Sequence, residues 1–86
     1  MQKVEIYTTP ICPYCHAAKA LLRGKGVTYQ EITVLDPALR AAMTQRAHGR
    51  RTVPQIFVGD THVGGYDDLA ALERQGKLDT LLGGAA

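Results

Sequence analysis

The chain has 86 residues, 45% of them hydrophobic and 21% charged, which is enough for one compact domain over residues 1–86 and too few for two. The formal net charge is +2, without a run of like charges that would suit a phosphate backbone, so we expect no nucleic-acid partner. No stretch of about 18 apolar residues predicts a membrane span, and the first residues enter a strand pattern without a signal sequence. We therefore expect a soluble, cytoplasmic protein without a membrane partner.

The first half of the chain predicts a strand, a helix and a second strand. Alternating apolar residues indicate a strand over residues 4–7, followed by a loop at residues 8–11. Pro13 suits the first position of a helix because its missing N–H needs no partner there, and alanines and leucines continue the helical pattern to Gly24. The second strand is predicted over residues 27–34.

The second half begins with a predicted helix and a hairpin. The Asp36-Pro37 pair is a helix cap followed by proline, and apolar residues then recur at three- and four-residue steps as far as Ala47. Residues 55–58 and 61–63 flank a Gly59-Asp60 turn, as the strands of a β-hairpin do.

The acidic pair Asp67-Asp68 stands at the start of the last predicted helix, and the apolar stripes of this helix are interrupted at Gly76, which leaves open whether the helix is split. The order of the elements is then β-α-β-α-β-β-α, which belongs to the α/β class. The tail at residues 83–86 is expected to fray.

Two cysteines three residues apart, Cys12 and Cys15, are too few for a secreted disulfide framework, and in a reducing compartment such a pair favours chemistry. The first β-α-β unit should bring their loop to the carboxyl edge of the sheet. With Pro13 at the first helical position, Cys12 falls at the N-cap, where the helix end favours a thiolate. Cys15 lies one turn further and deeper, so we expect Cys12 to attack and Cys15 to resolve.

A zinc site and burial in the core are the two other interpretations of the cysteine pair. A zinc site needs four ligands, and only His16, His48 and His62 remain to join the two thiolates, so no metal is expected. Burial as small core residues fits neither the loop position nor the intervening proline. His16 is interpreted as an exposed helical histidine rather than a proton donor.

Three segments resemble the signatures of the glutaredoxin family in order and spacing, over nearly the whole chain: Cys12-Pro13-Tyr14-Cys15, Thr52-Val53-Pro54-Gln55-Ile56-Phe57 and Gly64-Gly65-Tyr66-Asp67-Asp68-Leu69. The resemblance is to the small bacterial dithiol type, and it implies a thioredoxin-like fold with a four-stranded mixed sheet. It also implies a glutathione-dependent thiol-disulfide oxidoreductase, whose partners are glutathione and disulfide-bonded or glutathionylated proteins. Glutathione reductase would act only indirectly, by regenerating glutathione.

The resemblance implies a glutathione site as well. A cis Val53-Pro54 bond would turn the Val53 backbone toward Cys12, where the cysteinyl main chain of glutathione would pair with it. Gly65 would admit the ligand backbone, and the helix start that follows would receive the γ-glutamyl carboxylate. The residues at that helix start are Tyr66, Asp67 and Asp68, and either aspartate also suits a helix cap.

Three further residues complete the predicted glutathione site. Arg51, beside Thr52, is the cation assigned to the glycyl carboxylate, because a guanidinium binds a carboxylate through two hydrogen bonds. Tyr14, between the cysteines, is assigned to contact glutathione through its ring or hydroxyl.

One position departs from the family pattern. Many glutaredoxins carry a lysine a few residues before the first cysteine, and the corresponding residue here is Thr8. The residues left to supply the missing charge are Lys19, Arg46, Arg50 and Arg51.

Two alternative functions stay open at this point. One is a thioredoxin-like reductase fed directly by a flavoprotein, although the chain has no Trp and so lacks the thioredoxin motif. The other is a glutathione-ligated iron-sulfur carrier formed by a dimer that shares Cys12. Pro13 disfavours the carrier, because the resemblance ties cluster binding mostly to a glycine at that position, and a monomer is expected.

Overall fold

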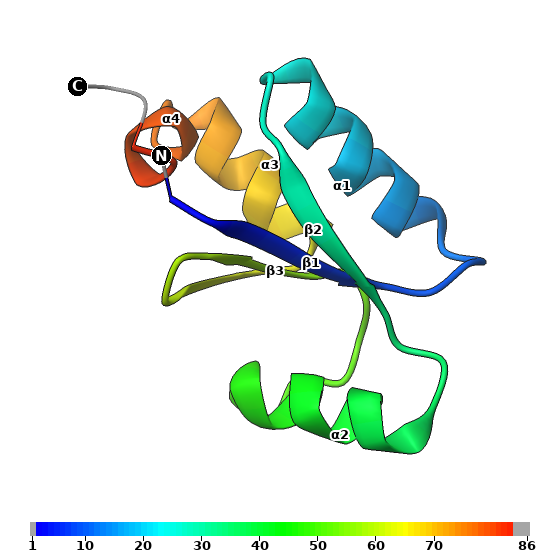
Figure 1. Cartoon of the computed structure of the whole chain (residues 1–86). Coiled ribbons are helices and arrows are strands. Elements are labelled where there is room, and N and C mark those ends of the chain that lie inside the picture. Colours follow the sequence, from blue (N-terminus) through cyan, green and yellow to red (C-terminus); the bar gives the residue numbers. More distant parts are fainter. Residues whose placement is uncertain (1, 84–86) are drawn as a thin grey trace.

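The computed structural model describes residues 2–83 and contains a four-stranded mixed sheet with helices on both faces (Figure 1). The expected order of elements is confirmed, and the last helix is split in two around Gly76, whose φ is +70°. The elements are β1 (Val4–Thr8), α1 (Pro13–Gly24), β2 (Tyr29–Thr33), α2 (Pro37–Arg46), β3 (Gln55–Val58), β4 (Thr61–Gly64), α3 (Tyr66–Arg74) and α4 (Leu78–Leu81).

The strands lie in the order β2-β1-β3-β4, so β1 and β3 are the central strands. β1 runs parallel to β2, as a strand-helix-strand crossover requires, and antiparallel to β3. β3 and β4 form the expected hairpin. This topology brings the end of β1, the loop before α1 and the start of β3 to the same edge of the sheet.

Alternation along the central strands divides the apolar residues between two clusters, one on each face of the sheet. Ile6 and Ile56 pack with α1, α3 and α4 on one face. Tyr7 and Phe57 pack with α2 on the other, with their rings edge to face at 5.6 Å. Figure 1 shows α1 and α3 above the sheet and α2 below it.

The second strand is shorter than predicted. β2 covers Tyr29–Thr33 rather than residues 27–34, and Val27 and Val34, which lie just outside it, are buried in the core. The acidic helix start predicted at Asp67-Asp68 is confirmed, since both aspartates lie in the first turn of α3, which begins at Tyr66 with Gly65 as its extended N-cap. The fraying predicted for residues 83–86 lies, from Gly84 onward, outside the described residues. Among the described helices, none has the length and apolar character needed to cross a membrane.

Candidate active site

Cys12 is the N-cap residue of α1, as predicted, and Pro13 occupies the first turn. The backbone of Cys12 is extended, with φ −153° and ψ 99°, and the Cys12 sulfur accepts a hydrogen bond from the Cys15 N–H at 3.2 Å. An N–H donor at the positive end of the helix dipole stabilises a negative charge on sulfur. The local sequence is thus sufficient to place a nucleophile at the start of α1.

The two cysteines differ in exposure and in acidity. Both are free thiols, but Cys12 keeps 8% of its surface exposed, whereas Cys15 is fully buried. Burial, followed by the side-chain hydrogen bond with Cys12, raises the pKa of the Cys15 thiol to about 12. Cys15 is therefore protonated at neutral pH, and Cys12 is the cysteine that an incoming disulfide can reach.

The segment before β3 faces Cys12 from the other side of the site. The Val53-Pro54 bond is cis, as the resemblance implied, and the Cys12 thiol donates to the Val53 carbonyl oxygen at 3.8 Å. Within residues 2–83, the Val53 N–H makes no hydrogen bond. An unpaired backbone donor beside the nucleophile is free to bind another main chain.

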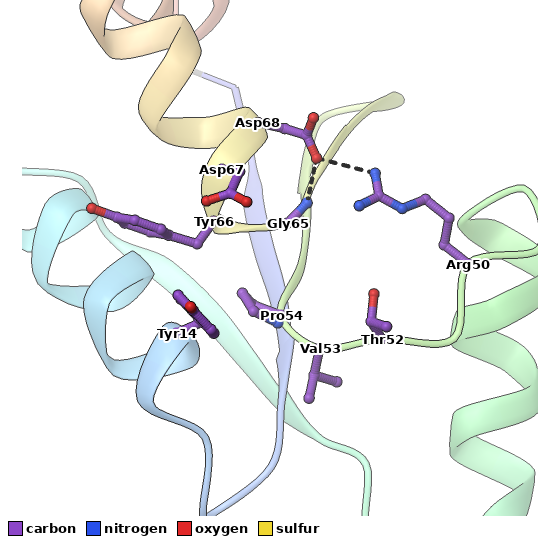
Figure 2. Close-up of a pocket in the computed structure, with 9 residues that line it drawn as sticks. All are labelled: Tyr14, Arg50, Thr52, Val53, Pro54, Gly65, Tyr66, Asp67 and Asp68. Carbon is purple, nitrogen blue, oxygen red and sulfur yellow. Dashed lines mark hydrogen bonds and ion pairs between the residues drawn. The ribbon is translucent and has the colours of Figure 1, made fainter.

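A cleft of about 220 Å³ extends from this segment to the start of α3 (Figure 2). Tyr14 reaches it from the first turn of α1 and stacks against Tyr66, with ring centroids 6.3 Å apart. The cleft is lined by residues from three separate segments of the chain: Tyr14, Arg50, Thr52, Val53, Pro54, Gly65, Tyr66, Asp67 and Asp68.

Asp68 ties the start of α3 to the loop that follows α2. Its Oδ2 accepts from the Gly65 N–H at 2.9 Å and from Arg50 Nη1 at 3.1 Å (Figure 2). The Gly65 hydrogen bond, and then the Arg50 guanidinium, hold the pKa of Asp68 below its ordinary value. Asp68 therefore supports the helix start, whereas the exposed Asp67 carboxylate lies at the cleft.

The structure brings together all the predicted glutathione contacts except Arg51. Arg51 does not line the cleft, and its carbonyl oxygen accepts from Arg40 Nη1 at 2.7 Å. Arg50, which the sequence suggested only as a substitute for the missing lysine, lines the cleft instead. These residues lie in an irregular loop, where no periodicity tells which of two neighbouring side chains points inward.

The position of the missing lysine is closed to solvent. Thr8 is 1% exposed, and its hydroxyl donates to Glu31 Oε2 at 2.6 Å. Lys19 pairs with the same oxygen at 2.9 Å, and these two contacts lower the pKa of Glu31. Arg46 is likewise paired, with Glu5 at 2.7 Å. Of the four cations suggested by the sequence, Arg50 is the one that lines the cleft.

Comparison with known proteins agrees with this arrangement. The glutaredoxin family model matches residues 4–63. The chain is 60% identical over 83 residues to a glutaredoxin of Pseudomonas aeruginosa, covering 95% of this chain and 98% of the relative. It is 52% identical over 82 residues to glutaredoxin 3 of Escherichia coli K12, covering 95% and 99%.

A solved structure shares both the fold and the family. The crystal structure of a buckwheat glutaredoxin-glutathione complex aligns with a TM-score of 0.86 at 34% identity, covering 95% of this chain and 77% of that one. The motifs, the geometry of Cys12 and Cys15, and these relatives agree on one family. The chain belongs to the glutaredoxin family and is a dithiol glutaredoxin, a glutathione-dependent thiol-disulfide oxidoreductase with a thioredoxin-like fold.

Proposed function

We propose that this enzyme, acting as one domain and as a monomer, reduces glutathionylated proteins and protein disulfides through Cys12. The Cys12 thiolate attacks the glutathione sulfur of a mixed disulfide, that disulfide breaks, and the protein thiolate leaves and takes up a proton. A glutathione thiolate then attacks the Cys12-glutathione disulfide, which releases oxidised glutathione and restores Cys12. The observation that carries the proposal is Cys12, capped by a backbone N–H, beside the free Val53 N–H.

Glutathione would lie along the cleft with its cysteinyl main chain paired to Val53. This pairing would bring the glutathione sulfur to Cys12, because the Val53 carbonyl oxygen lies 3.8 Å from Sγ. The γ-glutamyl carboxylate would bind at the start of α3, near Tyr66 and Asp67, where the first-turn N–H groups are available. The buckwheat relative, solved as a glutathione complex, supports this class of ligand.

Two neighbouring arginines are candidates for binding the glycyl carboxylate of glutathione. The assignment of the glycyl carboxylate to Arg51 stays a prediction, since that side chain lies outside the cleft. Arg50 is the guanidinium inside it, at 3.1 Å from Asp68, and would contribute positive charge to the same pocket. Replacing each arginine by glutamine in turn, and comparing the KM for a glutathionylated peptide, decides between them.

Protein disulfides require Cys15 in addition. Attack by Cys12 forms a mixed disulfide with the substrate protein, and Cys15 then attacks Cys12, which releases the reduced protein and leaves a Cys12-Cys15 disulfide. Glutathione reduces that disulfide. Cys15 gives up its proton as it attacks, because its pKa of about 12 keeps the resting thiol protonated.

Two cysteine variants test this division of roles. Cys15→Ser should keep the reduction of a glutathionylated peptide and lose the reduction of a protein disulfide, whereas Cys12→Ser should lose both. Both reactions should stop when glutathione is left out. Full activity of Cys12→Ser, or turnover supported by a flavoprotein reductase without glutathione, would overturn the proposal.

A further inference from the structure

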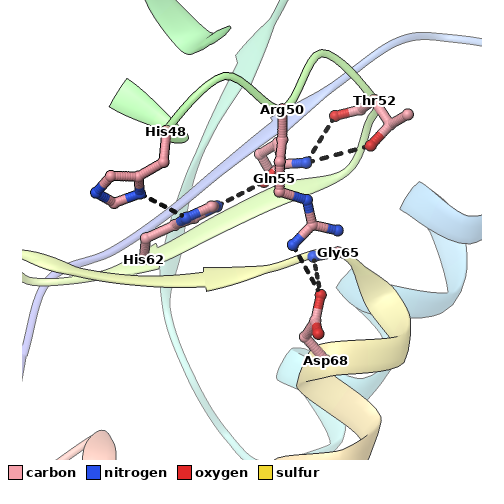
Figure 3. A network of polar contacts seen from close by, with 7 residues as sticks. All are labelled: His48, Arg50, Thr52, Gln55, His62, Gly65 and Asp68. Carbon is pink, nitrogen blue, oxygen red and sulfur yellow. Dashed lines mark hydrogen bonds and ion pairs between the residues drawn. The ribbon is translucent and has the colours of Figure 1, made fainter. Parts of the chain in front are cut away.

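A buried amide stands directly after the cis proline, on a strand whose other residues are apolar. Gln55 is fully buried, and burying an amide is costly unless its polar atoms are paired. Its Nε2 donates to the Thr52 carbonyl oxygen at 3.0 Å and to the Thr52 hydroxyl at 3.3 Å. Its Oε1 contacts His62 Nε2 at 2.7 Å (Figure 3). Both ends of the amide are therefore used.

The Thr52 carbonyl belongs to the same peptide group as the Val53 N–H. A peptide group is planar, and in the trans form its C=O and N–H point in opposite directions. The Thr52-Val53 bond is trans, so the hydrogen bond from Gln55 to the Thr52 oxygen also sets the direction of the Val53 N–H. That N–H is the unpaired donor beside Cys12.

The orientation of Gln55 depends in turn on His62. Because the Gln55 Nε2 faces two acceptors, its Oε1 faces the imidazole, so His62 Nε2 carries a proton and donates. Burial, and then the nearby charges of His48 and Arg50, lower the pKa of His62 and favour its neutral form. The ring also stacks on Phe57, with centroids 4.8 Å apart.

His48 completes the chain of contacts. The Nδ1 atoms of His48 and His62 lie 3.2 Å apart (Figure 3). Since the neutral His62 ring carries its proton on Nε2, its Nδ1 accepts and His48 Nδ1 donates. His48 thereby selects the tautomer of His62 that donates to Gln55.

We infer that Gln55 and His62 are positioning residues that hold the Thr52-Val53 peptide in the orientation required to bind the substrate main chain, and that His48 holds His62 in the required tautomer. The inference rests on the proposed pairing of glutathione with Val53. It assigns a function to a polar network that touches neither cysteine.

The test compares variants that remove one link and leave the surrounding packing in place. Gln55→Met keeps the length of the side chain without its hydrogen bonds, and His62→Phe keeps the stack on Phe57 without the N–H. Each should raise the KM for a glutathionylated peptide about fivefold, the change expected when one hydrogen bond no longer orients a binding group. The rate at which iodoacetamide alkylates Cys12 should stay unchanged, because the nucleophile and its cap are intact.

Two further variants separate positioning from general damage. His62→Gln returns an amide donor at a similar reach and should bring the KM back to within about twofold of wild type. Thr61→Ala changes an exposed residue of the same hairpin and should leave both the KM and the thermal midpoint unchanged. An unchanged KM in Gln55→Met and His62→Phe, or a loss of alkylation rate parallel to kcat/KM, would overturn the inference.

Nuclear magnetic resonance distinguishes this inference from the proposal on which it rests. Titrating the wild-type protein with S-methylglutathione should shift the Val53 amide resonance. If no shift occurs, the proposed binding of glutathione at Val53 and the inference are both wrong. If the shift occurs while the two variants keep the wild-type KM, the binding at Val53 is supported and the inference about the positioning residues is wrong.

Discussion

Helices α1 and α2 begin in the same way and yet do different things. Each has an extended N-cap residue followed by proline, Cys12 in α1 and Asp36 in α2. The Cys12 sulfur accepts from a backbone N–H at 3.2 Å, and the Asp36 carboxylate accepts from the Leu39 N–H at 2.8 Å. The local device is the same, an acceptor side chain on the first turn of a helix.

The surroundings of the two caps account for the difference. Asp36 is exposed, whereas Cys12 is 8% exposed and contacts the carbonyl oxygen of Val53, a residue that lines the cleft. The start of a helix therefore favours a negative charge on its N-cap side chain. Contact with a distant segment of the chain, here Val53, distinguishes the reactive cap from the structural one. Four predictions test this comparison, in decreasing order of expected effect.

The first concerns Cys15, which the first turn of α1 hides. With a pKa of about 12, raised by burial, the neutral thiol is favoured in the folded protein at every pH below that value. In Cys12→Ser at pH 8, burial, the largest cause of the raised pKa, should still keep Cys15 almost entirely as the neutral thiol, so that iodoacetamide labels it far more slowly than in the unfolded chain and at a rate that rises with pH. Mass spectrometry measures the labelling. The same variant unfolded in guanidinium is the control, and equal labelling rates in the two states would contradict the prediction.

The second moves the reactive cap to the other helix. Asp36→Cys, placed in a Cys12→Ser, Cys15→Ser background, should react with iodoacetamide at the start of α2. Glutathione-dependent turnover should nevertheless be at least about a thousandfold below that of Cys15→Ser, because Asp36 is exposed and lies outside the cleft that would position the substrate. Turnover within tenfold of that single-cysteine control would show that the cap alone makes the site.

The third breaks the cleft without touching either cysteine. Gly64 has φ +116°, and a Cβ there would collide with the Asp68 carboxylate and with Arg50 Nη1. These two groups form the ion pair that links the start of α3 to the loop that follows α2. We expect Gly64→Ala to lower the free energy of unfolding by about 1–3 kcal/mol and to raise the KM for a glutathionylated peptide about tenfold. Urea unfolding and steady-state kinetics measure the two effects.

The control for that substitution is Gly24→Ala at the end of α1, where a Cβ meets nothing within 4 Å and φ is not positive. The KM should equal the wild-type value. The free energy of unfolding should be equal to the wild-type value or slightly higher. If Gly64→Ala and Gly24→Ala have the same KM, the ion pair between Asp68 and Arg50 is not needed for substrate binding.

The fourth and smallest effect is at the structural cap. Asp36→Ala should cost about 1 kcal/mol of stability, because the Leu39 N–H loses its acceptor. The kinetic constants should not change, since α2 does not line the cleft. Asp36→Asn keeps a capping oxygen and should be close to wild type in urea unfolding, and a loss of turnover in Asp36→Ala would contradict the separation of the two helix starts.

Much of the fold was predictable because its signals are local. The proline and cap at the starts of α1 and α2, the Gly59-Asp60 turn and the alternation in the strands all act within a few residues of the chain. The N-cap position of Cys12 belongs to the same class. The acidic start of α3 was predictable as well, although Gly65 has no capping side chain and Asp68 supports the helix start from the third helical position.

The site was less predictable wherever it depends on contacts between distant residues. Nothing near Thr8 in the sequence indicates that Glu31 takes its hydroxyl and Lys19 together. Nor does the loop composition distinguish Arg50, which pairs with Asp68 across 18 positions, from the neighbouring Arg51. Gln55 and His62 were part of strand patterns, and their polar contacts emerged only when the hairpin was folded against the loop.

The amino-acid sequence by itself determined that a capped, reactive cysteine and a buried partner would stand on the first turn of a helix, because helix capping and helix dipoles arise from neighbouring residues. The tertiary structure decided what surrounds that cysteine: the Val53 carbonyl oxygen lies 3.8 Å from its sulfur, and Val53 in turn lines a cleft together with Tyr14, Arg50 and the start of α3. Those partners come from separate segments of the chain. Their distances from Cys12 depend on how the sheet orders its strands and on which polar side chains pair during packing, and no local pattern encodes either.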